Sequence, residues 1–178
     1  KQLKQMAYYD SLTGLPNRRL LEKLIRRELS FMERYGQETA LIILDLDDFK
    51  RINDTYSHPV GDNMLRQFAE FLKSSVRASD TVARFGGEEF IILLPKTSVE
   101  EGYAFAERLR KLIVEQRFTV GSVTLRVTSS FGVSSLSDKI NSGSFDSYYF
   151  LADKALYLAT QKGKNRVEKL KCEDEPEG

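Results

Sequence analysis

The sequence predicts an α/β fold with a mixed, mostly antiparallel central sheet that is flanked by helices. The first indication is the continuous apolar run of residues 39–44, which has the length of a strand buried on both faces. The second is a pair of β-prone runs, residues 80–83 and 90–95, joined by a Gly-Gly turn, as in an antiparallel hairpin. Helical segments lie between these runs, and such interleaving favours an α/β architecture.

The clearest helix is expected to start at Asn17 and to end at Gly36, because these residue types are common at helix starts and ends. Its apolar residues from Leu20 to Met32 recur on one face. Four more helices are predicted at residues 48–56, 60–76, 99–116 and 145–162. In the helix at 99–116, the residues expected to face the core are Ala104, Phe105, Leu109, Leu112 and Ile113.

The C-terminal half is predicted to add strands at residues 123–127, 128–135 and 166–170. A loop rich in Ser, Gly and Asn is expected at residues 138–145. We find no internal repeat and no linker between domains, so a single domain is predicted.

Composition excludes several classes of protein. The 178 residues are 41% hydrophobic and 30% charged, which is typical of one globular domain. The net charge of +1 gives no reason to expect nucleic acid as a partner or direct contact with a membrane. Cys172 is the only cysteine, which excludes an internal disulfide and fits a reducing compartment.

The ends of the chain indicate that it belongs to something longer. It begins at Lys1, and Leu3, Met6 and Tyr9 form a short helical stripe that we interpret as the end of an upstream helix. No apolar run approaches the ~20 residues of a membrane span, and no signal peptide is visible. We expect a cytoplasmic location, alone or as the cytoplasmic part of a membrane-anchored protein. The expected division is residues 1–10 as an upstream signalling helix or linker, 11–170 as the domain and 171–178 as a disordered tail.

Acidic residues gather where the predicted strands end. Asp45 follows the buried run directly, where a carboxylate is costly unless it is paired or binds a cation. Glu88 and Glu89 follow the Gly-Gly turn of the hairpin. Such a pair commonly marks only a solvated turn, and the acids at residues 47–48 fit the first turn of a helix. The sharper interpretation is a metal or acid–base site, because hard carboxylate oxygens suit Mg²⁺.

Four stretches resemble one known family. Residues 84–90 (RFGGEEF) resemble the signature of the GGDEF domains, the diguanylate cyclases, in its GGEEF variant. Residues 10–19 (DSLTGLPNRR), 44–54 (LDLDDFKRIND) and 152–157 (ADKALY) match further motifs of that family in the same order. The resemblance covers about residues 8–170. It implies the palm-like fold of nucleotidyl cyclases and the condensation of two GTP into cyclic di-GMP and two pyrophosphates.

The resemblance also implies roles for individual residues. Asp45, Glu88 and the Leu46 carbonyl match metal ligands for Mg²⁺, with Mn²⁺ as an alternative. Glu88 or Glu89 would accept the proton of the attacking 3′-hydroxyl, and Glu88 is our choice. Lys50 would stabilise charge on the phosphates. The expected substrate contacts are Asn53 and Asp62 for guanine, together with Phe49, His58 and Lys164, although a lone histidine is more often structural.

The chain departs from the family pattern at two places. Ser57 stands where the family usually has glycine, and because Pro59 fits the first turn of the next helix we expect no harm. Thr160 and Lys164 stand where the family commonly has a lysine and an arginine for the terminal phosphates. Thr160 lacks the positive charge of the family's lysine, and Lys164 presents a point charge in place of the bidentate fork of an arginine, although Lys162 offers a neighbouring cation. Weaker substrate affinity is therefore expected.

A second constellation lies before the hairpin. Arg77 and Asp80 form an Arg-x-x-Asp sequence five residues before the Gly-Gly turn, which local physics explains as a helix-end arginine and a capping aspartate. The resemblance instead implies an inhibitory site for cyclic di-GMP, with Arg108 as a supporting residue.

We therefore predict a homodimeric diguanylate cyclase with one GTP per subunit, controlled by an upstream sensory or receiver domain. One alternative is a catalytically inactive receptor for cyclic di-GMP, which the intact acidic residues disfavour. Another is a cyclase or polymerase-like palm for a different nucleotide, against which Asn53 and Asp62 argue.

Overall fold

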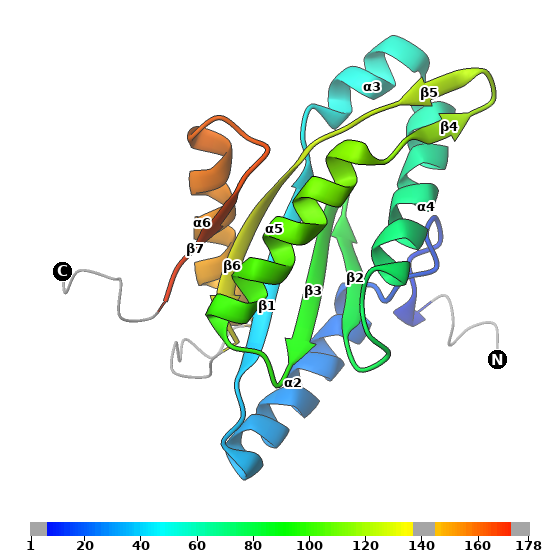
Figure 1. The fold of residues 1–178 in the computed structure, drawn as a ribbon. Coiled ribbons are helices and arrows are strands. Elements are labelled where there is room, and N and C mark those ends of the chain that lie inside the picture. Colours follow the sequence, from blue (N-terminus) through cyan, green and yellow to red (C-terminus); the bar gives the residue numbers. More distant parts are fainter. Residues whose placement is uncertain (1–6, 137–144, 172–178) are drawn as a thin grey trace.

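The computed structural model describes residues 7–136 and 145–171, and it confirms the predicted fold class. One five-stranded sheet has the order β2-β3-β1-β6-β7, with β1 at its centre (Figure 1). All neighbouring pairs are antiparallel except β6 and β7, which are parallel. The strands are β1 Thr39–Leu46, β2 Thr81–Gly86, β3 Glu89–Pro95, β6 Ser129–Ser135 and β7 Val167–Lys169.

Helices cover both faces of this sheet (Figure 1). Successive side chains of β1 point to opposite faces of the sheet, and each face is covered by its own hydrophobic cluster. The strand is therefore apolar at every position of residues 40–44. Ala40, Ile42 and Leu44 join the cluster beneath α4 and α5, whereas Leu41 and Ile43 join the cluster beneath α2 and α6. The helices are α2 Arg18–Tyr35, α3 Phe49–Tyr56, α4 His58–Ser74, α5 Val99–Glu115 and α6 Phe150–Gln161, the last preceded by the 3₁₀ helix η1 Phe145–Tyr149.

Local sequence signals account for several helix boundaries. The side chain of Asn17 accepts a hydrogen bond from the Leu20 N–H at 3.1 Å and caps α2, as predicted. Gly36 ends that helix with φ of 63°, a conformation that glycine adopts without a steric penalty. Ser98 and Glu101 form a capping box at the start of α5.

Helix α6 packs unusually close to β6, at Gly132. A Cβ atom at this position would lie 2.0 Å from the Ala152 carbonyl oxygen and 2.3 Å from the Leu156 nitrogen. The helix therefore rests on the backbone of the strand, and only glycine fits there. This contact fixes the position of α6, and with it the connection from α6 to β7.

The structure corrects some predictions about strands and termini. The strand predicted at 123–127 is limited to β5 Val123–Leu125, which pairs with the unpredicted β4 Phe118–Val120 in a separate two-stranded sheet. The predicted helix at 145–162 begins as η1 rather than as α-helix. Tyr9 forms a bridge with Pro16 instead of continuing a helical stripe. Most of the predicted loop, residues 138–144, and the segments 1–6 and 172–178 lie outside the described residues.

The core face of α5 also differs from the prediction. Leu112 is 43% exposed and Ala104 is exposed as well, whereas Gly102 and Ala106 face the core. A Cβ on Gly102 would lie 2.7 Å from the Cβ of Ala40, so this glycine brings the helix close to β1. None of the helices in the described part of the chain is long and apolar enough to cross a membrane.

Candidate active site

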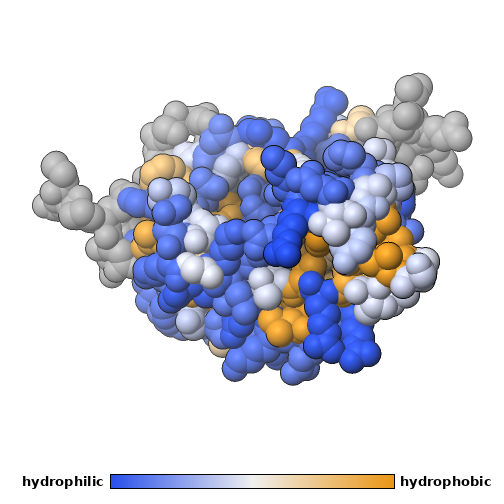
Figure 2. Space-filling model, turned by 90° about the horizontal axis from the view of Figure 1, so that it is seen from above, coloured by the Kyte–Doolittle hydropathy of each residue, from blue (hydrophilic) through white to orange (hydrophobic). Residues whose placement is uncertain are grey.

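The predicted acidic residues meet at the end of the sheet where β1 finishes. Asp45 lies opposite Glu89 in the pairing of β1 with β3, and the Leu46 N–H donates to the Glu88 carbonyl at 3.3 Å. The hairpin turn contains Gly87 with φ of 51° and a register shift between Arg84 and Gly86. Seen from above, this end of the molecule is mostly hydrophilic, with smaller hydrophobic areas (Figure 2). The structure therefore confirms that residues distant in the sequence share one edge.

The acidic cluster concentrates negative charge in a partly buried place. Burial, followed by the charges of the neighbouring Glu88, Glu89 and Asp47, raises the pKa of Asp45 to about 7 against the opposing effect of Lys164. The pKa of Glu89 is raised to about 7 by burial and then by Asp153 and Glu88. A nearby cation would stabilise such a cluster.

The donor set fits a magnesium ion that is shared with a substrate. Among the described residues, no three His, Cys, Asp or Glu side chains converge to enclose a metal ion. Mg²⁺ is commonly held by one or two carboxylates, with water and substrate phosphates completing its octahedron. Asp45, Glu88 and the carbonyl of Leu46 supply hard oxygens of this kind at one place.

Asp153 is a neighbour of this cluster to which the sequence had given no role. It lies on α6, where burial raises its own pKa, and its charge raises the pKa of Glu89. The ADKALY motif was the available signal, since it contains this aspartate.

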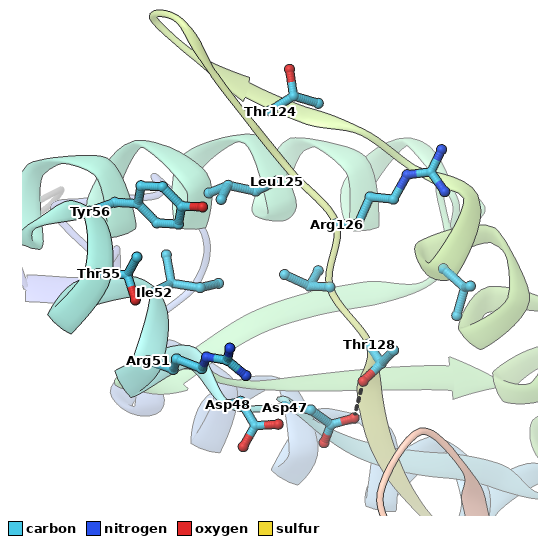
Figure 3. Close-up of a pocket in the computed structure, with 12 residues that line it drawn as sticks. Asp47, Asp48, Arg51, Ile52, Thr55, Tyr56, Thr124, Leu125, Arg126 and Thr128 are labelled. Atoms are coloured by element: carbon cyan, nitrogen blue, oxygen red, sulfur yellow. Dashed lines mark hydrogen bonds between the residues drawn. The ribbon is translucent and has the colours of Figure 1, made fainter.

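Asp47 is the second site residue to which the sequence had given no role beyond a first helical turn. Its carboxylate accepts a hydrogen bond from the Thr128 hydroxyl at 2.6 Å (Figure 3). It accepts a second one from the Ser130 hydroxyl at 2.7 Å. It also accepts from the Asn165 N–H at 3.0 Å. The Asp-x-Asp spacing with Asp45 was the only signal in the sequence.

Two lysines are the predicted contacts for the phosphates of the substrate. Lys50 is exposed in the first turn of α3. Lys164 lies on the connection from α6 to β7, and its Nζ is 2.6 Å from the Asp48 carboxylate. The hydrogen bond to Asp48 raises the pKa of Lys164, and the charges of Asp48, Asp47 and Asp45 raise it further. The charge of Lys164 in turn opposes the rise in the pKa of Asp45.

The predicted guanine contacts lie around the junction of α3 and α4. The Oδ1 atom of Asn53 is buried without a hydrogen-bond partner. A Cβ on Gly61 would lie 1.8 Å from this atom, so the glycine makes room for the amide. Asp62 and His58 are exposed on the first two turns of α4. The ring of Phe49 is buried in the core, so its predicted contact with substrate can involve only its backbone.

Ser57, which joins the two helices, has φ of 100°. This conformation favours glycine, so the replacement carries a backbone cost, contrary to the expectation that it does no harm. Pro59 does lie in the first turn of α4, as predicted.

The predicted inhibitory residues line one cavity of about 340 Å³. Arg77, Asp80 and Arg108 contribute to it from the α4–β2 connection and from α5. Asp80 also accepts a hydrogen bond from the Arg77 N–H at 2.8 Å, so it closes the local turn. The guanidinium of Arg108 lies 5.3 Å from the centre of the Phe105 ring. The local and the ligand-binding interpretations are therefore compatible.

A family model described as "Diguanylate cyclase, GGDEF domain" matches residues 7–166. The chain belongs to the GGDEF family. It is 40% identical over 165 residues to diguanylate cyclase DgcP of Pseudomonas aeruginosa and covers 24% of that protein. It is 39% identical over 169 residues to diguanylate cyclase A of Treponema denticola and covers 45% of it. These matches take in 93% of the present chain in both cases.

Solved GGDEF structures agree with the fold. Diguanylate cyclase SiaD of Pseudomonas aeruginosa, solved with its activator SiaC, superposes with a TM-score of 0.84 at 36% identity, over 95% of this chain and 64% of that one. A GGEEF domain of a diguanylate cyclase from Vibrio cholerae gives 0.76 at 34% identity, over 87% of this chain and 97% of that one. The resemblance drawn from the four motifs is therefore confirmed. The GGDEF domain spans less than half of the curated relatives named above.

Proposed function

We propose that this chain is a diguanylate cyclase domain that condenses two GTP molecules into cyclic di-GMP. In each of two successive steps, the 3′-oxygen of one GTP forms a bond to the α-phosphorus of the other. The bond from that phosphorus to the bridging oxygen breaks, pyrophosphate leaves and the hydroxyl proton passes to a base. The observation that carries the proposal is the meeting of Asp45 with the Glu88–Glu89 pair at one end of the sheet.

Each polar group at this end has a task in the reaction. When bound, Mg²⁺ would neutralise charge on the phosphates, and Asp45, Glu88 and the Leu46 carbonyl would hold it. Glu88 is our choice for the proton acceptor, with Glu89 as the alternative. Lys50 and Lys164 face developing charge on the phosphates. Asp62 and the amide of Asn53 offer complementary groups to the edge of guanine.

A homodimer follows from the stoichiometry of this mechanism. A cyclic product needs two attacks, and residues 7–136 and 145–171 offer one such acidic cluster, so two subunits have to bring their nucleotides face to face. We expect cyclic di-GMP formation to rise faster than linearly with protein concentration under conditions in which the chain is largely monomeric.

The product is proposed to control the enzyme through Arg77, Asp80 and Arg108. An arginine can donate to a phosphate and to a guanine edge, and a carboxylate can accept from guanine N–H groups. Strand β2 runs from the α4–β2 connection to the Gly-Gly turn, so the two sites lie at opposite ends of it (Figure 1). Product bound there does not occupy the substrate site, and inhibition is expected to be noncompetitive with GTP.

The signal that sets the activity is proposed to come from an upstream sensory or receiver domain. The supporting observation is that the chain spans only 24% to 45% of two curated relatives. Because its substrate is GTP, we place the domain in the cytoplasm.

The deciding experiment is to incubate the purified chain with GTP and Mg²⁺ and to identify the product by mass spectrometry. Glu88→Gln should abolish turnover with an unchanged far-UV circular dichroism spectrum, because it removes a metal ligand. Exposed Glu70→Gln on α4 is the matched control and should keep wild-type activity. Wild-type turnover in Glu88→Gln would contradict the assignment. If the chain binds cyclic di-GMP but forms none, the result would instead support the alternative of a catalytically inactive receptor.

A further inference from the structure

We infer that Asp47 is a positioning residue that holds Lys164 toward the triphosphate of the substrate. This inference rests on the proposed function, because it concerns the same nucleotide site. Asp47 lies just beyond the end of β1, two residues after Asp45, and its carboxylate points toward the start of β6 (Figure 3).

The contacts of Asp47 tie three segments of the chain together. Its own N–H donates to the Thr128 carbonyl at 2.9 Å, which joins the end of β1 to the segment before β6. Its Oδ1 atom accepts from the hydroxyl of Ser130. Its Oδ2 atom accepts both from the hydroxyl of Thr128 and from the backbone N–H of Asn165, which is 118 residues away in the sequence. A single side chain thus joins the acidic edge of the sheet to the α6–β7 connection.

The segment held in this way has a backbone that needs an anchor. Lys164 and Asn165 have φ of 62° and 44°, and they follow Gly163 with φ of 114°. Two successive non-glycine residues in the left-handed region are unfavourable and persist only when surrounding contacts hold them. Such contacts include the bond from the Lys164 N–H to the Ala159 carbonyl at 3.0 Å and the bond from the Asn165 N–H to Asp47. The Arg110 guanidinium also donates to the Asn165 side-chain oxygen at 3.0 Å.

This backbone conformation decides where the charge of Lys164 lies. The Nζ atom of Lys164 reaches the Asp48 carboxylate, beside the acidic cluster. A lysine presents a point charge on a flexible stem, so its distance from a phosphate depends on where its backbone is held. We therefore expect the anchor at Asp47 to act on phosphate affinity, through Lys164, more than on guanine recognition.

A purely structural role for Asp47 makes different predictions. If Asp47 only stabilised the sheet edge, its removal would weaken all ligands together, and its effect would add to that of removing Lys164. If Asp47 acts through Lys164, its removal costs little more once Lys164 is gone. A double-mutant cycle with ligands that differ in their phosphates separates the two roles.

The experiment measures binding by calorimetry with Mg²⁺, so that it does not depend on turnover. The probes are guanosine 5′-(α,β-methylene)triphosphate, which cannot release pyrophosphate, and guanosine, which has no phosphates. The proteins are the wild type, Asp47→Ala, Lys164→Ala, the double variant and Glu70→Ala as the control on an exposed helix face.

We expect each single substitution to weaken the triphosphate analogue about tenfold, the loss of one charge-assisted hydrogen bond. The double variant should be no more than about twofold weaker than either single variant, and guanosine affinity should stay within about twofold of the wild type. In turnover, the KM for GTP should rise more than kcat falls. Glu70→Ala should bind like the wild type.

Multiplicative losses in the double variant, or an equal loss of guanosine affinity in Asp47→Ala, would overturn the inference. If Asp47→Ala does not fold, the same cycle is run with the combined Thr128→Val and Ser130→Ala substitutions, and the same two outcomes decide. Absence of cyclic di-GMP formation by the wild type would contradict the proposed function instead, because the binding cycle requires no reaction.

Discussion

Arg84 links the turn that opens the domain to the turn that carries Glu88. Its Nη1 atom lies 3.0 and 3.2 Å from the two carboxylate oxygens of Asp10. Its Nε and Nη2 atoms donate to the Gly87 carbonyl at 3.0 and 2.7 Å. The side chains of Arg84 and Asp10 are only 12% and 22% exposed, so the pair is largely shielded from water. We therefore expect that a displacement of the opening turn would be transmitted through Arg84 to the acidic hairpin.

Arg84→Lys should destabilise the protein and lower its activity, because one ammonium replaces the planar group whose separate nitrogens reach Asp10 and Gly87. We expect a loss of about 2 kcal/mol, since the partly buried Asp10 carboxylate loses its charge-assisted bonds from Nη1. For a domain of this size that loss lowers Tm by about 4–8 °C, which differential scanning calorimetry would detect. Arg66→Lys on the exposed face of α4 is the matched control. Wild-type Tm and turnover in Arg84→Lys would contradict the proposed coupling.

Asp10 should make a part of the stability depend on pH in the acid range. Burial raises the pKa of Asp10, but the hydrogen bonds from Thr13 and Arg84 outweigh that effect and hold it below the ordinary value of 3.8. Because the folded pKa is depressed, this stabilisation is present above pH ~4 and is lost as the pH falls through the folded value. Asp10→Asn should therefore lower Tm at pH 6, and the difference from the wild type should shrink at pH 3. A difference that stays constant between these pH values would exclude this role.

Asp48→Asn should improve the apparent affinity for GTP. The Asp48 carboxylate holds Lys164 at 2.6 Å, and a triphosphate has to compete for that lysine. The two side chains are 61% and 44% exposed, so the ion pair is weak and its loss should lower KM no more than about fivefold. The gain should diminish at high salt, which screens exposed pairs. Asp54→Asn, exposed on the same helix, serves as the control, and an unchanged or higher KM in Asp48→Asn would refute the competition.

Arg77→Ala should relieve inhibition by cyclic di-GMP while it leaves the substrate site intact. One charge-assisted contact is worth about 1.5–3 kcal/mol, so the affinity for product should fall roughly ten- to a hundredfold. Calorimetry with cyclic di-GMP measures this directly, and initial rates without product should match the wild type. Unchanged product binding would leave Arg77 as an ordinary helix-end arginine.

The parts of the fold that could be predicted depend on local physics. The run of β1 is apolar at every position because it is buried on both faces, so its sequence identifies it without reference to the rest of the chain. The Asn17 cap and the Gly36 stop act within one helical turn and were equally readable. Strands β4 and β5 have three residues each, which is too short for a periodic signal to stand out. Leu112 kept helical spacing but was exposed, because neighbouring elements decide how wide the buried stripe of α5 is.

The candidate site was predictable only in part, because some of its contacts join segments that are far apart in the sequence. The meeting of Asp45 with the Glu88–Glu89 pair followed from strand pairing, whereas the roles given to Asn53 and Asp62 came from the family resemblance. The hydrogen bond from the Asn165 N–H to Asp47 joins residues that are 118 positions apart in the sequence. No sequence motif predicts such a contact between a carboxylate and a distant backbone N–H.

Gly132 determines how close α6 lies to the edge of β1 at the proposed nucleotide site. Helix α6 carries Asp153 in its first turn and leads at its end into the connection with Lys164. Any side chain at Gly132 would push this helix away from the sheet. We expect Asp153 and Lys164 to move away from the edge of β1 together with it. A methyl group buried beneath the helix, without contact to any ligand, would thus change the reach of the proposed site toward both metal and phosphates.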